Sequence, residues 1–116
     1  MKSTRSLLAA LLIALPFSVF AVGAIAVDDE EGDTEPGYGL VTGMDSKSEA
    51  TAGAMKECRK SGNKGCKVAV WFETCGAYAH SPKYFGIGYG KSKKVAESAA
   101  LAECSGACKI LVSECE

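Results

Sequence analysis

Two stretches of the sequence match each other at one constant offset: Ser46–Cys58, SKSEATAGAMKEC, and Ser92–Cys104, SKKVAESAALAEC. In each stretch a serine is followed by two alanines and a final cysteine that recur every fourth residue. Residues with this spacing lie on one face of a helix. A serine before such a pattern is a typical N-cap, and Glu49 would complete a capping box with Ser46. Each stretch therefore predicts a helix with a face of small side chains.

Similar strand patterns flank both predicted helices. A short strand and a glycine-rich strand precede each helix, and a strand opened by cysteine follows it. The corresponding pairs are Gly23–Val27 with Gly76–His80, Gly37–Gly43 with Phe85–Gly90, and Cys66–Val70 with Cys108–Val112. Such self-similarity is typical of an internal duplication. We expect an α+β fold in which two β-β-α-β repeats form antiparallel sheet, with two helices packed on it and three disulfides.

Alternation within the strands predicts which side chains share a face. One such face holds Phe85, Ile87 and Tyr89, and the glycines between them should receive the alanine face of a helix. In the strand after the first helix, alternation places Val68, Val70 and Phe72 on one face, and Ala69 and Trp71 on the other. Aromatic residues at alternate positions favour core or cross-strand packing over a binding platform.

The six cysteines indicate a disulfide framework: Cys58, Cys66, Cys75, Cys104, Cys108 and Cys115. An even number in a short exported chain favours disulfides. A zinc site is the alternative, but none of the spacings is a zinc signature. Fifteen pairings are conceivable with six cysteines. The duplication selects Cys58–Cys66, Cys104–Cys108 and Cys75–Cys115, with the last pair joined across the pseudo-twofold axis.

The N-terminal sequence predicts export. Lys2 and Arg5 precede an apolar run from Leu7 to Ala21 that is short for a membrane span. We expect a signal peptide at residues 1–21 and a single disulfide-stapled domain at 22–116, with no membrane association after cleavage. Cleavage after Ala26 and an uncleaved anchor are the alternatives. The expected location is the periplasm or the extracellular medium.

Charge is distributed unevenly along the chain. The net charge is −1, and removing Lys2 and Arg5 from the 13 basic residues leaves 11 against 14 acidic residues. This balance argues against a nucleic acid partner. Six carboxylates lie close together, at Asp28, Asp29, Glu30, Glu31, Asp33 and Glu35. They indicate either a solvated loop or a contact patch for a basic partner. Their spacing is not that of an EF-hand loop.

The repeated order of strand, alanine-rich helix and cysteine-led strand, together with Cys75-Gly76-Ala77-Tyr78-Ala79, resembles the secreted bacterial family named domain of unknown function 4189. The resemblance covers nearly all of the expected mature chain and implies export and this fold. The acidic segment between the first two strands is longer and more charged than is usual in that family. The resemblance implies no catalytic residues.

Residues suited to catalysis are few. His80 is the one histidine, and a nucleophile would have to be a serine because the cysteines are expected to form disulfides. Ser81 and Ser92 are better explained as a turn residue and a helix cap. We therefore expect a protein that is not an enzyme, with no catalytic residue, cofactor or metal site.

Two functions remain. The first is a protein-binding module that acts in the envelope as an inhibitor or immunity protein against a cell-wall hydrolase or toxin. A small rigid domain loses little entropy on docking, and the acidic segment suits a basic partner protein. The second is a secreted host-directed or envelope-structural protein with no enzyme target.

Overall fold

The computed structural model describes residues 21–30 and 35–116, and these form the two predicted β-β-α-β repeats. The predicted signal segment lies outside the described residues except for Ala21. The elements of the first repeat are β1 (Val22–Asp28), β2 (Gly37–Met44), α2 (Lys47–Lys60) and β3 (Lys67–Phe72). Those of the second repeat are β4 (Cys75–His80), β5 (Phe85–Gly90), α3 (Lys93–Glu103) and β6 (Lys109–Cys115).

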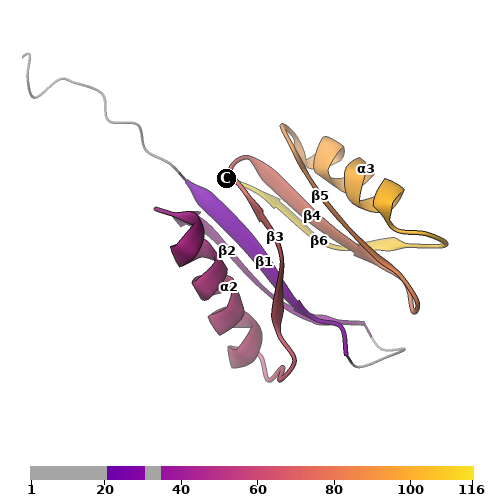
Figure 1. Cartoon of the computed structure of the whole chain (residues 1–116). Coiled ribbons are helices and arrows are strands. Elements are labelled where there is room, and N and C mark those ends of the chain that lie inside the picture. Colours follow the sequence, from indigo (N-terminus) through magenta and orange to yellow (C-terminus); the bar gives the residue numbers. More distant parts are fainter. Residues whose placement is uncertain (1–20, 31–34) are drawn as a thin grey trace, which may run out of the picture.

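Each repeat forms its own antiparallel sheet of three strands. The strand orders are β2-β1-β3 and β5-β4-β6, so the first strand of each repeat is central. The expected α+β fold is therefore confirmed, with its antiparallel strands divided between two sheets (Figure 1). Edge strands β3 and β5 belong to different sheets but lie next to each other.

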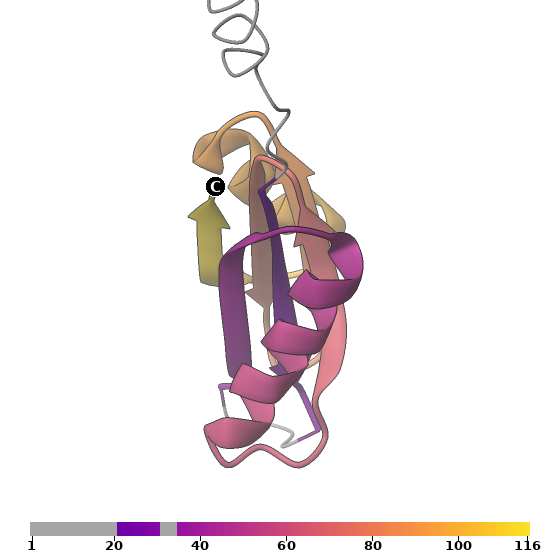
Figure 2. The same cartoon turned by 90° about the vertical axis from the view of Figure 1, so that its left-hand side faces the viewer.

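The two sheets pack face to face, with one helix on the outer face of each. Figure 2 shows α2 lying across the outer face of its own sheet. Buried side chains of both sheets form the central core, namely Ile25, Val27, Val70, Phe72, Tyr78 and Val112. Alanines and cysteines fill the two outer cores beneath the helices. Small residues on both sides of these interfaces allow each helix to approach its sheet closely.

Close approach of helix and sheet explains the glycine stripe. A Cβ atom at Gly86 or Gly88 would overlap backbone atoms of α3, and one at Gly39 would overlap backbone atoms of α2. The predicted packing of glycine strand against alanine helix is thus confirmed. Ser46 and Ser92 cap the helices by accepting from the amides of Glu49 and Val95, both at 3.1 Å.

A β-bulge interrupts the last strand of each repeat at the same place. Ile25 pairs with Val70 but Ala26 pairs with Val68, which leaves Ala69 as the extra residue. The corresponding shift in the second repeat leaves Leu111 unpaired. A bulge changes the face of every residue before it. The expectation that Val68 shares a face with Val70 and Phe72 was therefore wrong.

The three disulfides join the predicted cysteines: Cys58–Cys66, Cys75–Cys115 and Cys104–Cys108. The expected place of one of them was wrong. Cys75 begins β4 and lies directly opposite Cys115 on β6, so this disulfide lies within the second sheet and does not cross between the repeats. A polar contact does cross, because the Gly43 amide of β2 donates to Oε1 of Glu116 at 2.7 Å.

Candidate functional site

Asp28, the first residue of the acidic segment, is buried and structural. It is the last residue of β1 and is 2% exposed. Its two carboxylate oxygens accept from the amides of Gly65 at 3.0 Å and Glu30 at 3.2 Å. These hydrogen bonds, that of Gly65 first, lower the pKa of Asp28. The expectation that Asp28 contacts a partner is therefore corrected: its carboxylate holds the loop between α2 and β3.

The remaining carboxylates of the acidic segment differ in their exposure. Asp29 lies 3.2 Å from the Lys67 ammonium group, and its side chain is 23% exposed. Glu30 and Glu35 are exposed, whereas Glu31 and Asp33 lie outside the described residues. Within the described part of the chain, Glu30 and Glu35 are thus the fully exposed acidic residues of this segment, and Asp29 is partly exposed.

The residues considered for nucleophilic chemistry, His80, Ser81 and Ser92, each take part in the fold. His80 ends β4 and pairs with Phe85 of β5. Ser81 accepts from the Tyr84 amide at 3.1 Å, as expected for a turn residue, and Ser92 caps α3. Among residues 21–30 and 35–116, no three His, Cys, Asp or Glu side chains come together as metal ligands would.

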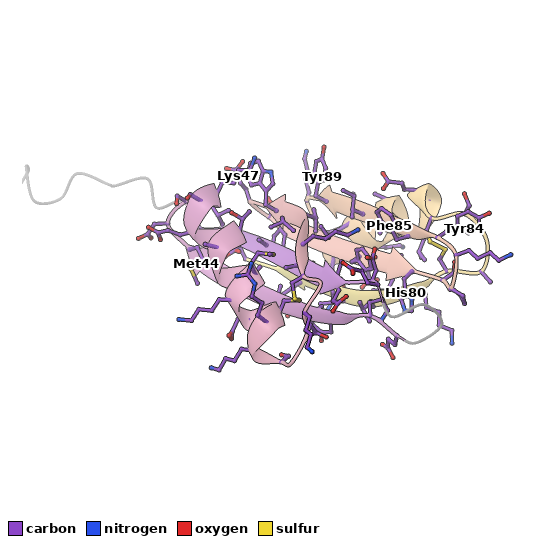
Figure 3. The ribbon with its side chains drawn as sticks, turned by 60° about the horizontal axis from the view of Figure 1, so that its bottom comes forward. Met44, Lys47, His80, Tyr84, Phe85 and Tyr89 are labelled. Carbon is purple, nitrogen blue, oxygen red and sulfur yellow. A yellow bond between two sulfur atoms is a disulfide. The ribbon has the colours of Figure 1, made fainter. Side chains whose placement is uncertain are left out.

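A row of exposed apolar side chains runs along the two neighbouring edge strands. Its members are Val68 and Trp71 of β3, and Phe85 and Tyr89 of β5. We call these four residues the β3–β5 face. Tyr89 is 70% exposed and Phe85 51%. Apolar groups gathered on a surface in this way are characteristic of interaction sites. In Figure 3, Tyr89 lies near Lys47, and Phe85 lies towards the end that carries His80 and Tyr84.

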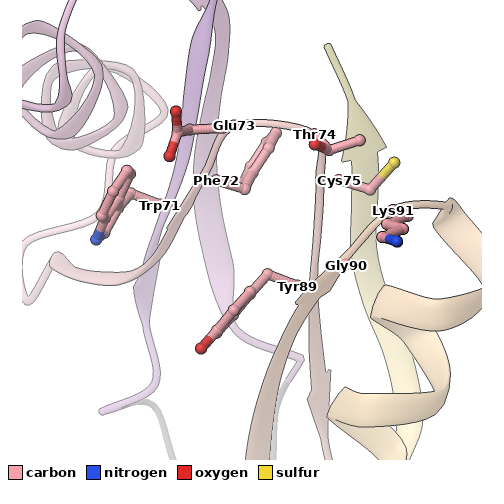
Figure 4. Close-up of a pocket in the computed structure, with 8 residues that line it drawn as sticks. All are labelled: Trp71, Phe72, Glu73, Thr74, Cys75, Tyr89, Gly90 and Lys91. Atoms are coloured by element: carbon pink, nitrogen blue, oxygen red, sulfur yellow. The ribbon is translucent and has the colours of Figure 1, made fainter.

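The β3–β5 face contains a cleft of about 420 Å³ at the ends of the two strands. Trp71 and Tyr89 approach the cleft from different sheets (Figure 4), whereas Phe72 and Cys75 of its lining are buried. The remaining lining residues are Glu73, Thr74, Gly90 and Lys91. We call this site the aromatic cleft. Beside it, the ammonium group of Lys47 lies 4.8 Å from the centre of the Trp71 ring, within cation–π range.

The opposite side of the molecule has equivalent backbone positions with different side chains. Trp71 lies opposite Ala24 in the first sheet, and Ser113 lies opposite Ala77 in the second. Since Ala24 and Ala77 correspond, Ser113 takes the place of Trp71. Aligning the glycine-rich strands in the same way puts Thr42 where the second repeat has Tyr89. The fold therefore does not require an aromatic residue at either position.

The aromatic cleft was missed by the sequence analysis, which assigned alternating aromatic residues to packing. That interpretation holds for Phe72, which is 2% exposed, but Trp71 is 39% exposed. The signal that could have found the cleft was available in the sequence. It is the difference between the two repeats at matched positions, where one has an aromatic residue and the other a hydroxyl.

No curated protein and no solved structure is significantly similar to the chain. In the described part of the chain, neither helix has the length and apolar composition required to span a membrane. One protein family does match, over residues 22–115, which include both repeats and all six cysteines. The duplicated, disulfide-linked chain thus belongs to the family described as Domain of unknown function (DUF4189).

Proposed function

We propose that this protein is an exported protein-binding module, and that it acts in the cell envelope as an inhibitor or immunity protein against a basic cell-wall hydrolase or toxin. Its contact surface is the β3–β5 face, with the aromatic cleft at one end of it. Three disulfides support an exported location, because such crosslinks form and persist outside the reducing cytoplasm.

The observation that carries this proposal is the difference between the two repeats. In a duplicated fold, each repeat can be compared with the other, because matched positions have the same backbone environment. A side chain that differs between matched positions is therefore not required by the fold. Trp71 and Tyr89 expose aromatic side chains at positions where the other repeat has Ser113 and Thr42 and forms the same fold. Tryptophan and tyrosine are enriched among residues that dominate protein–protein binding energy. Exposed aromatic residues that the fold does not need are therefore best explained by binding.

Charge and rigidity support a basic protein as the partner. Asp29, Glu30 and Glu35 lie at the other end of the β3–β5 face, which we call the acidic end. Lys67 links this end to the face, because its ammonium group contacts Asp29 and lies 5.9 Å from the centre of the Phe85 ring. A negative rim accelerates the encounter with a positively charged partner. The disulfides hold the strands in place before docking, so little conformational entropy is lost on binding.

The test has two parts. Natively exported protein is first examined by intact mass, with alkylation but no reduction, and we expect a chain that starts at Val22 with no alkylated cysteine. That protein is then immobilised to capture partners from envelope extract and added to a cell-wall hydrolase assay. A captured basic hydrolase or toxin that the protein inhibits supports the proposal. If no such partner is captured and no hydrolase is inhibited, the host-directed or structural function is the better explanation.

A further inference from the structure

A second, smaller cavity lies at the acidic end of the β3–β5 face. It has a volume of about 80 Å³ and opens between the end of β1, the β4–β5 turn and the start of β5. Its lining is mostly polar or aromatic and includes Asp29, Tyr78, His80, Ser81, Tyr84 and Phe85. This volume suits the charged end of one side chain but not a larger ligand.

Tyr78 is the residue of this cavity that requires explanation. The residue is 1% exposed, and its hydroxyl oxygen has no described group in good hydrogen-bonding geometry, although the Asp29 carboxylate lies close enough to raise its pKa. A buried hydroxyl without a partner destabilises a protein. Burial, followed by the nearby Asp29 carboxylate, raises the pKa of Tyr78 to about 12, so the phenol is neutral near pH 7.

The first repeat shows that the fold does not need this hydroxyl. Tyr78 lies on the central strand of its sheet, and the matched residue on the central strand of the other sheet is Ile25, which is fully buried. His80 likewise corresponds to Val27, which is also buried. An apolar residue is therefore compatible with the backbone position, and the second repeat has polar groups there instead.

The surroundings of Tyr78 suit a cation that donates hydrogen bonds. Asp29 supplies a carboxylate and Phe85 supplies an exposed ring face. The chain's own Lys67 already uses both groups, at 3.2 Å from Asp29 and 5.9 Å from the Phe85 ring centre. The Lys67 side chain is 59% exposed, and an exposed ion pair of this kind is weak enough to be exchanged. Lys83 also lines the cavity and opposes a second cation, but it is exposed and free to turn outward.

We propose that this cavity, which we call the Tyr78 pocket, binds the ammonium or guanidinium group of a lysine or arginine side chain, with Asp29 and the Tyr78 hydroxyl as acceptors. The pocket would thereby anchor the basic partner. The proposal rests on the proposed function only in assigning the cation to a partner protein. Its chemistry can be tested without that partner.

The test uses n-butylammonium as the probe and butyrate at equal ionic strength as the control. Binding is followed by NMR of the full exported domain, labelled in its aromatic rings. We expect butylammonium, and not butyrate, to shift the resonances of Tyr78 and Phe85. Tyr78→Phe and Asp29→Asn should each weaken the apparent affinity at least fivefold. Tyr38→Phe, an exposed tyrosine outside the pocket, should leave the affinity unchanged.

Stability in urea provides a second measurement. Because the hydroxyl has no partner in the unliganded protein, Tyr78→Phe should unfold at the same urea concentration as the wild type or at a higher one. A lower midpoint would overturn the proposal, since it would reveal an internal partner for the hydroxyl. Shifts with butyrate, or with neither probe, would also overturn it. These outcomes leave partner capture by the aromatic cleft untouched, so the two proposals can fail separately.

Discussion

Trp71 of β3 and Ser113 of β6 occupy the same position in the two repeats, opposite Ala24 and Ala77 on the central strands of their sheets. The backbone around them is equivalent down to the bulge two residues earlier in each strand. Their side chains differ fully in character, since Trp71 borders the aromatic cleft and Ser113 donates to the Glu97 carboxylate of α3. The two repeats have therefore kept one fold and diverged at the surface.

Gly88 should tolerate no side chain. A Cβ atom there would overlap the carbonyl oxygen of Ala96 and the amide nitrogen of Ala100, and neither backbone atom can move away without displacing α3. Forcing extra volume into such an interface costs about 2 kcal/mol. We expect Gly88→Ala to lower the free energy of unfolding in urea by that amount or more.

Gly53→Ala is the matched control for Gly88→Ala. The first repeat has Val41 on the strand where the second has Gly88, and Gly53 on the helix where the second has Ala99. The atoms nearest to a Cβ at Gly53 would therefore be those of the Val41 side chain, which can adjust, at 3.3 Å or more. Alanine also has the higher helix propensity. Gly53→Ala should therefore leave the urea midpoint nearly unchanged. Equal losses for the two variants would show that helix–sheet distance does not explain the glycine stripe.

The elements that followed from local pattern were predictable, and those that depend on register were not. Serine caps, alanine faces and the glycine stripe could be predicted because each depends on near neighbours in the sequence. The bulges at Ala69 and Leu111 arise from pairing with a strand far away in the chain, so alternation alone misplaced Val68. Asp28 was assigned to the surface because its partner, the Gly65 amide, is distant in the sequence. The aromatic cleft forms only where strands of two sheets meet.

The disulfides should contribute unequally to stability. Cys75 and Cys115 are separated by 40 residues, and Cys104 and Cys108 by 4. A crosslink that closes a longer loop restricts the unfolded chain more, by about 2 kcal/mol for this difference. Replacing Cys75 and Cys115 with alanine should therefore lower the urea midpoint more than replacing Cys104 and Cys108. The two double variants remove the same groups, so equal midpoints would contradict the entropic explanation.

Asp28 should make stability sensitive to acid. Its pKa is lowered in the folded protein, so its carboxylate stabilises the fold fully above the unfolded-state pKa of about 4 and loses this effect as the pH falls through the lowered value. Asp28→Asn should be less stable than the wild type at pH 7. The difference in urea midpoint should stay constant down to about pH 5 and shrink below about pH 4. A difference that does not change with pH would contradict a charged Asp28.

The acidic end should make partner capture sensitive to salt. Exposed charges are screened over about 8 Å at physiological ionic strength, so the association rate with a basic partner should fall as salt increases. Glu30→Gln combined with Glu35→Gln should reduce this salt dependence and leave the urea midpoint unchanged, because both side chains are exposed. Asp28 is kept in this variant since it is structural. If the association rate of the wild type does not depend on salt, the carboxylates of the acidic end do not accelerate the encounter with the partner.

Binding through the aromatic cleft is the central claim, and the affinity of cleft variants for a captured partner tests it most directly. The variant is Trp71→Ala with Tyr89→Ala, and the control is Thr42→Ala, the matched position on the opposite side. Loss of central aromatic residues typically weakens binding by about 2 kcal/mol or more, which is a factor of roughly thirty. We predict at least a tenfold loss of affinity for the cleft variant, with an unchanged fold, and full affinity for Thr42→Ala. Equal affinity of all three proteins, or no partner for the wild type, would contradict the account.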